Sequence, residues 1–446
     1  MNVINIVKSF SRSRHRKIVS NVAWMISDNA VRLVVGTITF LWLVRYLHPE
    51  DFGVLNYAFS FVALFAVFAT LELPQIAIKR LVKREDQKYN IIGTAFFMRL
   101  VGGLVLLVLA VIGVMIVKPN DLLTYWMVVA ISIGYLLQSG NVINYWFQSK
   151  IKSKYTVIPG MIATVLGGVI RLTLIFFKAP LFMFAAVMVI DTILIMIGLF
   201  ISYRLDGQNF FKWRFNWQLA KGMLKEVWPL MIAGVAIAVY MRIDRVLLSH
   251  FVDDWSVGIY AVAAKLSELW YIFPVAITST LFPKIVGAKM LGKEEYKMRL
   301  QLLYGVLAWL SIIVAILTTI FSRYIIQILY GSEYMGAAVV LSIHIWTLLF
   351  VSLGLISGHY LIIEKLTKIW LVRAIVGAVT SVALNLILIP RFGAVGAAIA
   401  TLSAQAVSVV IILVFRSCRS QLKMFIGIFD IYSLKRIIKT ICFSKE

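Results

Sequence analysis

Long apolar stretches separated by short polar turns recur from one end of the 446-residue chain to the other. Each is about twenty residues or longer, which is the length an α-helix needs to cross a hydrocarbon core about 30 Å thick. Only helices and closed barrels satisfy their backbone hydrogen bonds in such a core, and the stretches lack the alternating polarity of barrel strands. We therefore predict twelve membrane-spanning helices, over residues 19–46, 52–78, 89–117, 122–148, 155–177, 181–203, 226–251, 255–283, 300–321, 335–362, 369–389 and 394–415.

The composition agrees with this pattern. Hydrophobic residues make up 61% of the chain and charged residues 14%, with a mean hydropathy of +0.92. A soluble domain has roughly 45–50% apolar and about 25% charged residues. The first apolar stretch is too long for a cleavable signal, and two cysteines near the end, Cys418 and Cys442, do not suggest a disulfide framework. We expect an all-α membrane protein.

Basic residues alternate from one side of the expected membrane to the other. The long loops 79–88, 150–154, 204–225 and 284–299 are basic, whereas the turns between them are short and poor in lysine and arginine. With the N-terminus inside, 32 of the 44 basic residues lie inside and five lie outside. Cytoplasmic loops carry this excess, so both termini are expected in the cytoplasm of a bacterial inner membrane. Topology and anionic headgroups thus account for the net charge of +24 without a nucleic-acid partner.

A weak internal repeat divides the chain into two halves. Gly53 aligns with Gly258 and Ala58 with Ala263, about 205 residues later, and acidic residues precede the glycine in both copies. Six expected spans per half make the repeat parallel, with its pseudo-two-fold axis along the membrane normal, as in transporters built from two like bundles. We predict an N-terminal lobe (1–204), an amphipathic linker (205–225), a C-terminal lobe (226–416) and a basic tail (417–446).

Charged residues within the expected spans carry the functional hypothesis. An ionised side chain at mid-bilayer costs roughly 2.5–3.5 kcal/mol on insertion scales, so such residues usually face a cavity and have a task. The cations outnumber the acids, and arginine grips phosphate and carboxylate, which favours an anionic cargo. The candidate cargo-binding cations are Arg32, Arg99, Arg171, Arg242, Arg245 and Lys265. The candidate residues for proton or sodium coupling are Asp28, Asp191, Asp244 and Glu268.

Structural roles compete with these assignments. Asp28 with Arg32, and Lys265 with Glu268, have the spacing of ion pairs on one helix face. Arg373 and Arg171 have the alternative of reaching the headgroups, and Glu72 lies near the inner end of its span. Arg242 and Arg245 lack an acid on their own helix face, which makes them the strongest candidates for a cationic cavity. His344 and His359 are either proton carriers or hydrogen-bonded between helices.

Several short motifs resemble one known family. Tyr46-Leu47-His48-Pro49-Glu50-Asp51-Phe52-Gly53 is similar to a stretch of the Wzx-type polysaccharide flippases, with His48 where that family often has glycine. The segment 385–400 resembles a stretch shared across the multidrug/oligosaccharidyl-lipid/polysaccharide exporter superfamily. The resemblance implies two six-helix lobes around a V-shaped cationic cavity, a MATE-like fold. It also implies that the cargo is an undecaprenyl-diphosphate-linked glycan repeat unit, turned from the cytoplasmic to the outer leaflet.

Two rival functions can be weighed against this resemblance. A drug exporter of the same superfamily should have an acid-dominated N-terminal lobe, whereas arginines dominate here. A membrane-bound glycan polymerase or ligase should carry a large outer loop with catalytic residues, and the longest expected outer connection is 322–334. No phosphate-binding loop of an ATPase is present, so we expect a non-enzyme without cofactors, driven by a proton or sodium gradient. Its expected partners are a lipid-linked anionic glycan, membrane lipids, and the polymerase and glycosyltransferases of the same pathway.

Overall fold

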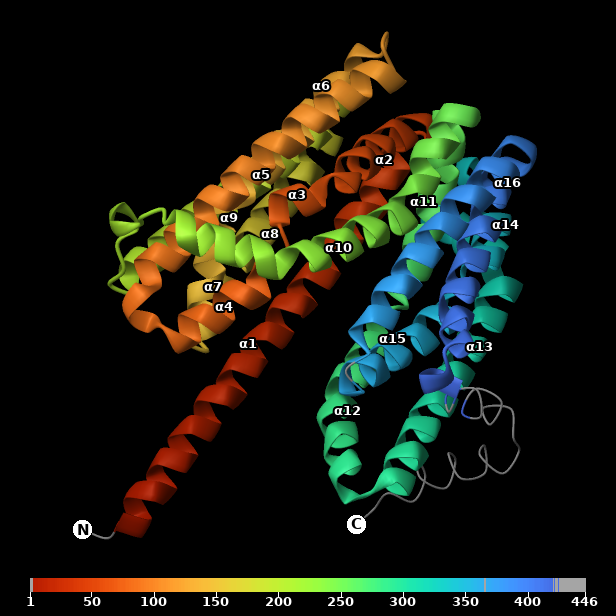
Figure 1. Cartoon of the computed structure of the whole chain (residues 1–446). Coiled ribbons are helices and arrows are strands. Elements are labelled where there is room, and N and C mark those ends of the chain that lie inside the picture. Colours follow the sequence, from red (N-terminus) through yellow and green to blue (C-terminus); the bar gives the residue numbers. More distant parts are fainter. Residues whose placement is uncertain (1–2, 365, 420, 422–423, 425–446) are drawn as a thin grey trace. The chain divides into compact units, whose positions relative to one another are not determined.

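The computed structural model describes residues 3–364, 366–419, 421 and 424. Within this part of the chain every regular element is helical, which agrees with the expected all-α class (Figure 1). The expected basic tail lies outside the described residues from 425 onward. The α-helices are α1 (Val3–Tyr46), α2 (Pro49–Leu64), α3 (Ala66–Thr70), α4 (Pro74–Lys83), α5 (Lys88–Val117), α6 (Leu122–Leu137), α7 (Val142–Ser149), α8 (Lys154–Phe176), α9 (Leu181–Leu205), α10 (Trp217–Phe251), α11 (Asp254–Leu269), α12 (Ile272–Leu291), α13 (Lys293–Tyr330), α14 (Ala337–His344), α15 (Thr347–Ile363) and α16 (Thr367–Val410).

Helix length and hydropathy support most of the expected spans. Nine helices among the described residues are long and apolar enough to cross a membrane. The number is ten if α2 forms one span with α3–α4, from which it is separated by a bend of 53°. The other expected spans correspond to α10 and to a division of α16 at Gly393. There the backbone has φ 54° and ψ −133°, so α16 is two helical stretches joined where the sequence predicts a turn. The count of twelve stays a prediction.

The chain forms two compact units that are continuous through α2 and α10. Unit 1 comprises Met1–Leu47 and Ala58–Ala238, and unit 2 comprises His48–Tyr57 and Val239–Glu446. The expected linker, 205–225, therefore lies in unit 1 together with the first part of α10. The expected lobe boundaries at residues 204 and 226 stay a prediction.

Unit 1 is a bundle in which α8 and α9 occupy the middle of the packing order. Helix α1 lies along α8, α8 packs on α9, α9 on α6, and α6 on α5 (Figure 1). The start of α6 is set by Asp121, whose Oδ1 accepts a hydrogen bond from the backbone N of Thr124 at 2.9 Å. This N-cap satisfies an otherwise unpaired backbone donor, and it lies in one of the polar turns that the sequence predicts.

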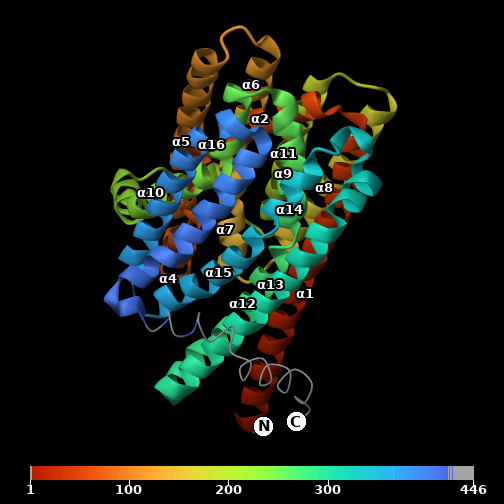
Figure 2. The same cartoon turned by 90° about the vertical axis from the view of Figure 1, so that its right-hand side faces the viewer.

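Unit 2 is built around α11, which packs against α14 and α16, while α12 lies against α13 (Figure 2). Its first turn is fixed in the same way as that of α6, because Asp253 Oδ1 accepts from the backbone N of Ser256 at 2.7 Å. Ten residues of α11 are buried, most of them small or aliphatic, so this helix is the centre of the unit.

The two glycines aligned by the internal repeat contact each other within unit 2. A Cβ added at Gly53 would lie 1.6 Å from the carbonyl O of Asp254, and one at Gly258 would lie 1.9 Å from the carbonyl O of Pro49. Pro49 and Asp254 are themselves equivalent in the repeat, so the contact is reciprocal, as expected about a two-fold axis. Only glycine fits at either position, which explains why both copies carry it.

Candidate functional site

Two ion pairs of unit 1 lie within the expected spans on the neighbouring helices α1, α8 and α9. On α1, Arg32 Nε donates to Asp28 Oδ1 at 2.9 Å, and the side chains are 46% and 19% exposed. The expected pairing one helical turn apart is confirmed. Between α8 and α9, Arg171 donates to Asp191, and these side chains are 26% and 22% exposed. Arg171 therefore has an acidic partner on the adjacent helix.

Glycines on one face of α8 make room for both ion pairs. A Cβ at Gly160 would lie 2.4 Å from Arg32 Nη2, and one at Gly167 would lie 1.9 Å from Asp191 Oδ1. Residues seven apart lie on nearly the same side of a helix, about 10 Å from each other along its axis. The charged groups of α1, α8 and α9 are thus arranged along a single glycine-lined face of α8.

The two carboxylate oxygens of Asp191 have different surroundings. Its Oδ2 accepts from Arg171, whereas its Oδ1 is buried without a hydrogen-bond partner among the described residues. A buried carboxylate oxygen that lacks a donor is costly, so such an atom is a natural place for a proton or a small cation. In this respect Asp191 differs from Asp28, neither of whose oxygens is among the buried, unpartnered atoms of the described residues.

Arg99 stands apart from these pairs. It is only 5% exposed, and its Nη1 donates to the hydroxyl of Tyr145 on α7 at 2.8 Å. Glu72 lies close enough to Tyr145 to act on its hydroxyl electrostatically, and its backbone has φ 48° at the bend between α3 and α4. In this conformation, therefore, Arg99 lies in the core of unit 1 and does not line an open surface.

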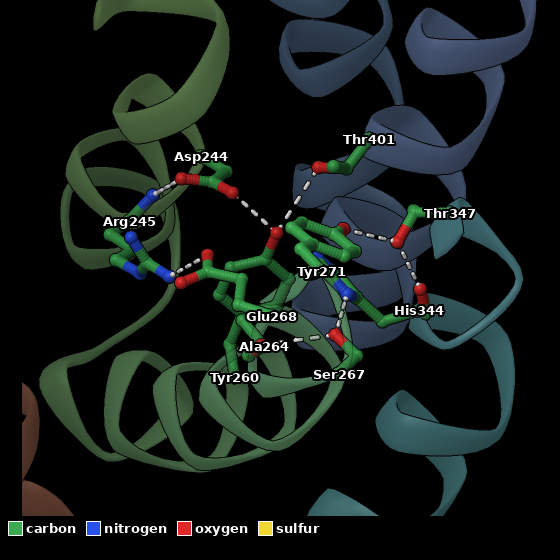
Figure 3. Close-up of polar contacts among 10 residues, drawn as sticks. All are labelled: Asp244, Arg245, Tyr260, Ala264, Ser267, Glu268, Tyr271, His344, Thr347 and Thr401. Carbon is green, nitrogen blue, oxygen red and sulfur yellow. Dashed lines mark hydrogen bonds and ion pairs between the residues drawn. The ribbon is translucent and has the colours of Figure 1, made fainter. Parts of the chain in front are cut away.

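Unit 2 carries a buried polar network that joins α10, α11, α14, α15 and α16 (Figure 3). Asp244 is 3% exposed and accepts hydrogen bonds from the backbone N of Arg245 at 2.8 Å and from the Tyr260 hydroxyl. Because Tyr260 donates to Asp244, its oxygen accepts from Thr401 Oγ1, 3.1 Å away. Hydrogen bonds from Asp244 through Tyr260 to Thr401 thus connect α10, α11 and α16.

Arg245 pairs with an acid on another helix. Its Nη2 donates to Glu268 Oε1 at 3.2 Å, and its guanidinium carbon lies 5.8 Å from the centre of the Tyr260 ring. The sequence offers Arg245 no acid on its own helix face, and its partner Glu268 lies on a different helix, α11. Two of its nitrogens, Nε and Nη1, are buried without hydrogen-bond partners among the described residues. The side chain is 4% exposed, so it contacts cargo only if the network opens.

A second set of hydrogen bonds surrounds His344, whose ring lies 5.7 Å from that of Tyr260. Ser267 Oγ donates to the backbone carbonyl of Ala264 and is hydrogen-bonded to His344 Nδ1 at 2.5 Å. Thr347 Oγ1 likewise donates to the carbonyl of His344 and accepts from the Tyr271 hydroxyl at 2.6 Å. His344 of α14 is thus hydrogen-bonded to Ser267 of α11, between helices. That is the structural alternative that the sequence offered for it.

The other intramembrane charges occupy different environments. Arg242 is half-buried, Lys265 is exposed, and both lie close enough to Glu268 to act on its carboxylate electrostatically. Glu268 also pairs with Arg245 at 3.2 Å, and the pairing expected of Glu268 with Lys265 stays a prediction. Arg373 does not reach for headgroups: its Nη1 donates to the carbonyl of Gly354 and to Ser357 Oγ, each at 2.8 Å.

Some partners in these sites carry no signal that a single sequence reveals. Tyr145, Tyr260 and Thr401 look like ordinary membrane-helix residues, and only packing shows that they bind charged groups. The glycines of α8 are a signal that could have been read, because Gly160 and Gly167 share one face of a span that also carries Arg171. Small residues at this spacing allow close approach of another helix.

Comparison with known proteins places this geometry in a class. Solved structures of the lipid II flippase MurJ in an inward closed conformation and of an inward-facing MATE transporter of the MOP superfamily are similar to this chain. The TM-scores are 0.72 and 0.70, at 15% and 12% sequence identity. The alignments cover 95% of this chain and 93% of the MurJ structure, and 89% of this chain and 98% of the MATE structure. The all-helical fold of this chain is therefore the fold of these two solved structures.

Sequence comparison then gives the family. The model of the polysaccharide biosynthesis protein family matches residues 18–289, and that of the lipid II flippase MurJ matches residues 158–445. The chain belongs to the polysaccharide biosynthesis protein family, the Wzx-type polysaccharide flippases, and is a transporter, not an enzyme.

Two relatives illustrate the range of this family. The capsular polysaccharide biosynthesis protein CapF of Staphylococcus aureus is 22% identical over 402 residues, covering 88% of this chain and 97% of the relative. The probable flippase AglR of Haloferax volcanii is 31% identical over 173 residues, covering 36% of this chain and 35% of the relative.

Proposed function

We propose that this flippase turns a lipid-linked glycan with an anionic phosphate linkage, of the undecaprenyl-diphosphate type, from the cytoplasmic to the outer leaflet of a bacterial inner membrane. Family membership supports the flippase class. The observation that carries the choice of an anionic cargo is the exposed Arg32–Asp28 pair on the membrane-spanning part of α1. The polymerase and glycosyltransferases of the same pathway are the protein partners that this cargo requires.

The exposure of Arg32 is the central step. An ionised side chain exposed to acyl chains costs roughly 2.5–3.5 kcal/mol or more, so a 46% exposed arginine in a span is best explained by contact with water. Arg171 lies farther along the same face of α8, where it is one-quarter exposed. Two arginines about 10 Å apart on a wet surface suit a diphosphate and a negatively charged sugar, because the planar guanidinium binds such oxygens in pairs.

The acids of these pairs give the proposed route for the driving ion. Asp191 combines an arginine partner with one unpaired oxygen, so protonation or sodium binding there would release Arg171 for the cargo. Asp28, Asp244 and Glu268 remain further candidates for this coupling, and Arg99, Arg242, Arg245 and Lys265 remain further candidates for cargo contacts. Replacement of Asp191 by asparagine should leave cargo binding intact but remove the dependence of transport on the ion gradient.

Glycan output in cells tests the proposal. Variants Arg32→Gln and Arg171→Gln should reach normal membrane levels yet reduce surface glycan at least tenfold, while the lipid-linked precursor accumulates inside. The matched control is Lys297→Gln, which removes the cation of an exposed ion pair of similar geometry, Glu294–Lys297 at 2.9 Å, on α13. Normal glycan output from both arginine variants, at normal membrane levels, would refute the cargo contacts proposed for α1 and α8.

The orientation is proposed from the basic loops. The segments 79–88, 150–154 and 204–225 lie on one side in the alternation of loops, and the excess of lysine and arginine assigns that side to the cytoplasm. Labelling of single cysteines introduced at exposed loop positions by a membrane-impermeant reagent tests this. If the reagent labelled the basic loops in intact cells, these loops would lie outside and the proposed orientation would be wrong.

A further inference from the structure

Unit 1 contains a second cationic site, away from the ion pairs of α1, α8 and α9. It is a cavity of about 330 Å³ between α4, the start of α5 and the start of α10. The cations among its lining residues are Lys79, Arg80, Lys83 and Arg84, and the acid is Glu226. The cavity therefore carries a formal charge of +3, which favours an anionic ligand.

The internal pairing of this cavity leaves three of its cations available. Arg80 forms an ion pair with Glu226 of α10, which joins the two walls. Lys79, Lys83 and Arg84 are exposed, and the described residues offer none of them an ion-pair partner. Cations in the last turn of α4 are favoured by its helix dipole, which accounts for their position along the helix. The dipole does not explain why they converge on a hollow with the first turns of two other helices.

Apolar side chains form another part of the wall, together with the amide of Gln87. Ile91 and Leu219 line the cavity beside the cations. The same two helices also carry exposed apolar side chains elsewhere on their surface: Val82 of α4 is 64% exposed, and Trp217 and Leu224 of α10 are 72% and 49% exposed. A ligand that fits both parts has a negatively charged head and an apolar body.

The neighbouring segment 210–217 is held firmly on α5. The ring of Trp213 lies 5.3 Å from that of Phe96, and the backbone N of Asn216 donates to Thr94 Oγ1 at 3.0 Å. A Cβ at Gly93 would lie 2.6 Å from the backbone N of Arg214, so the segment also needs that glycine. Aromatic side chains fixed in this way at the end of a span are typical of the depth of lipid headgroups.

From this combination we infer that the cavity binds the phosphate headgroup of an anionic membrane phospholipid, with Lys79, Lys83 and Arg84 contacting the phosphate and the acyl chains lying along α4 and α10. Basic pockets between membrane helices on the cytoplasmic side bind such headgroups, and each lysine or arginine near an anionic surface contributes on the order of 1 kcal/mol. Free phosphate and the diphosphate of the cargo share the chemistry of the head. The apolar wall favours a membrane phospholipid over free phosphate.

Lipid binding to the purified full-length protein tests the inference. The protein would be transferred to nanodiscs of phosphatidylcholine containing a small fraction of fluorescent phosphatidylglycerol, and binding would be titrated by energy transfer from the tryptophans. The variant Lys79→Gln/Lys83→Gln should weaken binding about tenfold or more. Its matched control, Lys221→Gln/Lys225→Gln, removes two exposed lysines at the same spacing from α10, outside the cavity lining, and should weaken binding less than threefold.

Each alternative has a distinct result. Equal weakening by the two double variants would mean attraction to diffuse surface charge and would overturn the site. Competition by millimolar inorganic phosphate or pyrophosphate as effective as that by phosphatidylglycerol would mean a free-phosphate or diphosphate site and would overturn the lipid assignment. Unchanged thermal unfolding without phosphatidylglycerol shows that the variants fold, and Arg84→Gln provides a second test with a single exposed change.

Discussion

Unit 1 and unit 2 both carry charged residues in membrane-spanning helices, but they expose them differently. In unit 1 the pairs Asp28–Arg32 and Arg171–Asp191 are open to their surroundings, with side chains 19–46% exposed. In unit 2 Asp244 and Arg245 are 3% and 4% exposed, while Glu268, the acid paired with Arg245, is 25% exposed (Figure 3). Intramembrane charge alone therefore does not identify a cargo site. Open pairs are available for exchange with a ligand, whereas sealed pairs first have to be broken.

The free-energy cost of removing one partner also differs between exposed and buried ion pairs. An ion pair in contact with water contributes about 0–1 kcal/mol, because each charge is solvated when its partner leaves. Removal of one partner from a buried pair costs about 3–5 kcal/mol, because the other charge stays in a medium that cannot solvate it. If the comparison is right, stability should respond to mutations in unit 2 and transport to mutations in unit 1.

The largest effect is expected at Glu268. Its replacement by alanine leaves the guanidinium of Arg245 buried without its acidic partner, and we expect a loss of about 3–5 kcal/mol in the free energy of unfolding. The measurement is reversible unfolding of the detergent-solubilised protein, with the midpoint of thermal unfolding as a first indicator.

Two further variants make the Glu268 measurement specific. The control Glu294→Ala removes an 88% exposed acid from a pair with Lys297 and should cost less than about 1 kcal/mol. The double variant Glu268→Leu/Arg245→Met removes both charges and should recover most of the lost stability. If Glu268→Ala and Glu294→Ala were equally stable, the proposed difference between buried and exposed ion pairs would be wrong.

An intermediate effect is expected at Tyr260. Its replacement by phenylalanine keeps the ring but removes the hydroxyl that donates to Asp244 and accepts from Thr401. Both groups are buried and would lose a partner, so we expect a loss of about 1–3 kcal/mol in the free energy of unfolding. The same unfolding assay measures it, with Tyr324→Phe on α13, where the side chain is 65% exposed, as a control that should stay within about 0.5 kcal/mol. A Tyr260 variant as stable as this control would indicate that the network is hydrated.

Local patterns in the sequence predicted those features that depend on neighbouring residues. Span positions follow from apolar length, and α6 and α11 begin at the predicted polar turns, where the structure shows Asp121 and Asp253 as caps. The Asp28–Arg32 pair follows from a spacing of four on one helix. The contact of Gly53 with Gly258 was signalled by their alignment in the repeat, although its reciprocal geometry was not.

Pairings between helices could not be predicted in this way. Arg245 and Glu268 are 23 positions apart, and Arg171 and Asp191 are 20 apart, so each pair depends on how two helices rotate and slide when they pack. The number of possible partners is large and the sequence gives no preference among them. Arg373 shows the same difficulty: its acceptors are a backbone carbonyl and a serine on α15, which no charge pattern could indicate.

The smallest effect on stability, and the sharpest test of the comparison, is expected at Arg32. If this arginine faces water, Arg32→Gln should change the free energy of unfolding by less than about 1 kcal/mol, because Asp28 is then solvated. If the pair faces acyl chains, the unpaired carboxylate of Asp28 would cost several kcal/mol, as in a buried site. The measurement is unfolding in detergent together with the membrane level in cells. Asp28→Asn and the double variant Asp28→Asn/Arg32→Gln complete a mutant cycle, and the coupling energy between the two residues should be below about 1 kcal/mol. A coupling energy as large as that between Arg245 and Glu268 would place the α1 pair among the sealed charges and remove the argument for a wet, cargo-binding face on unit 1.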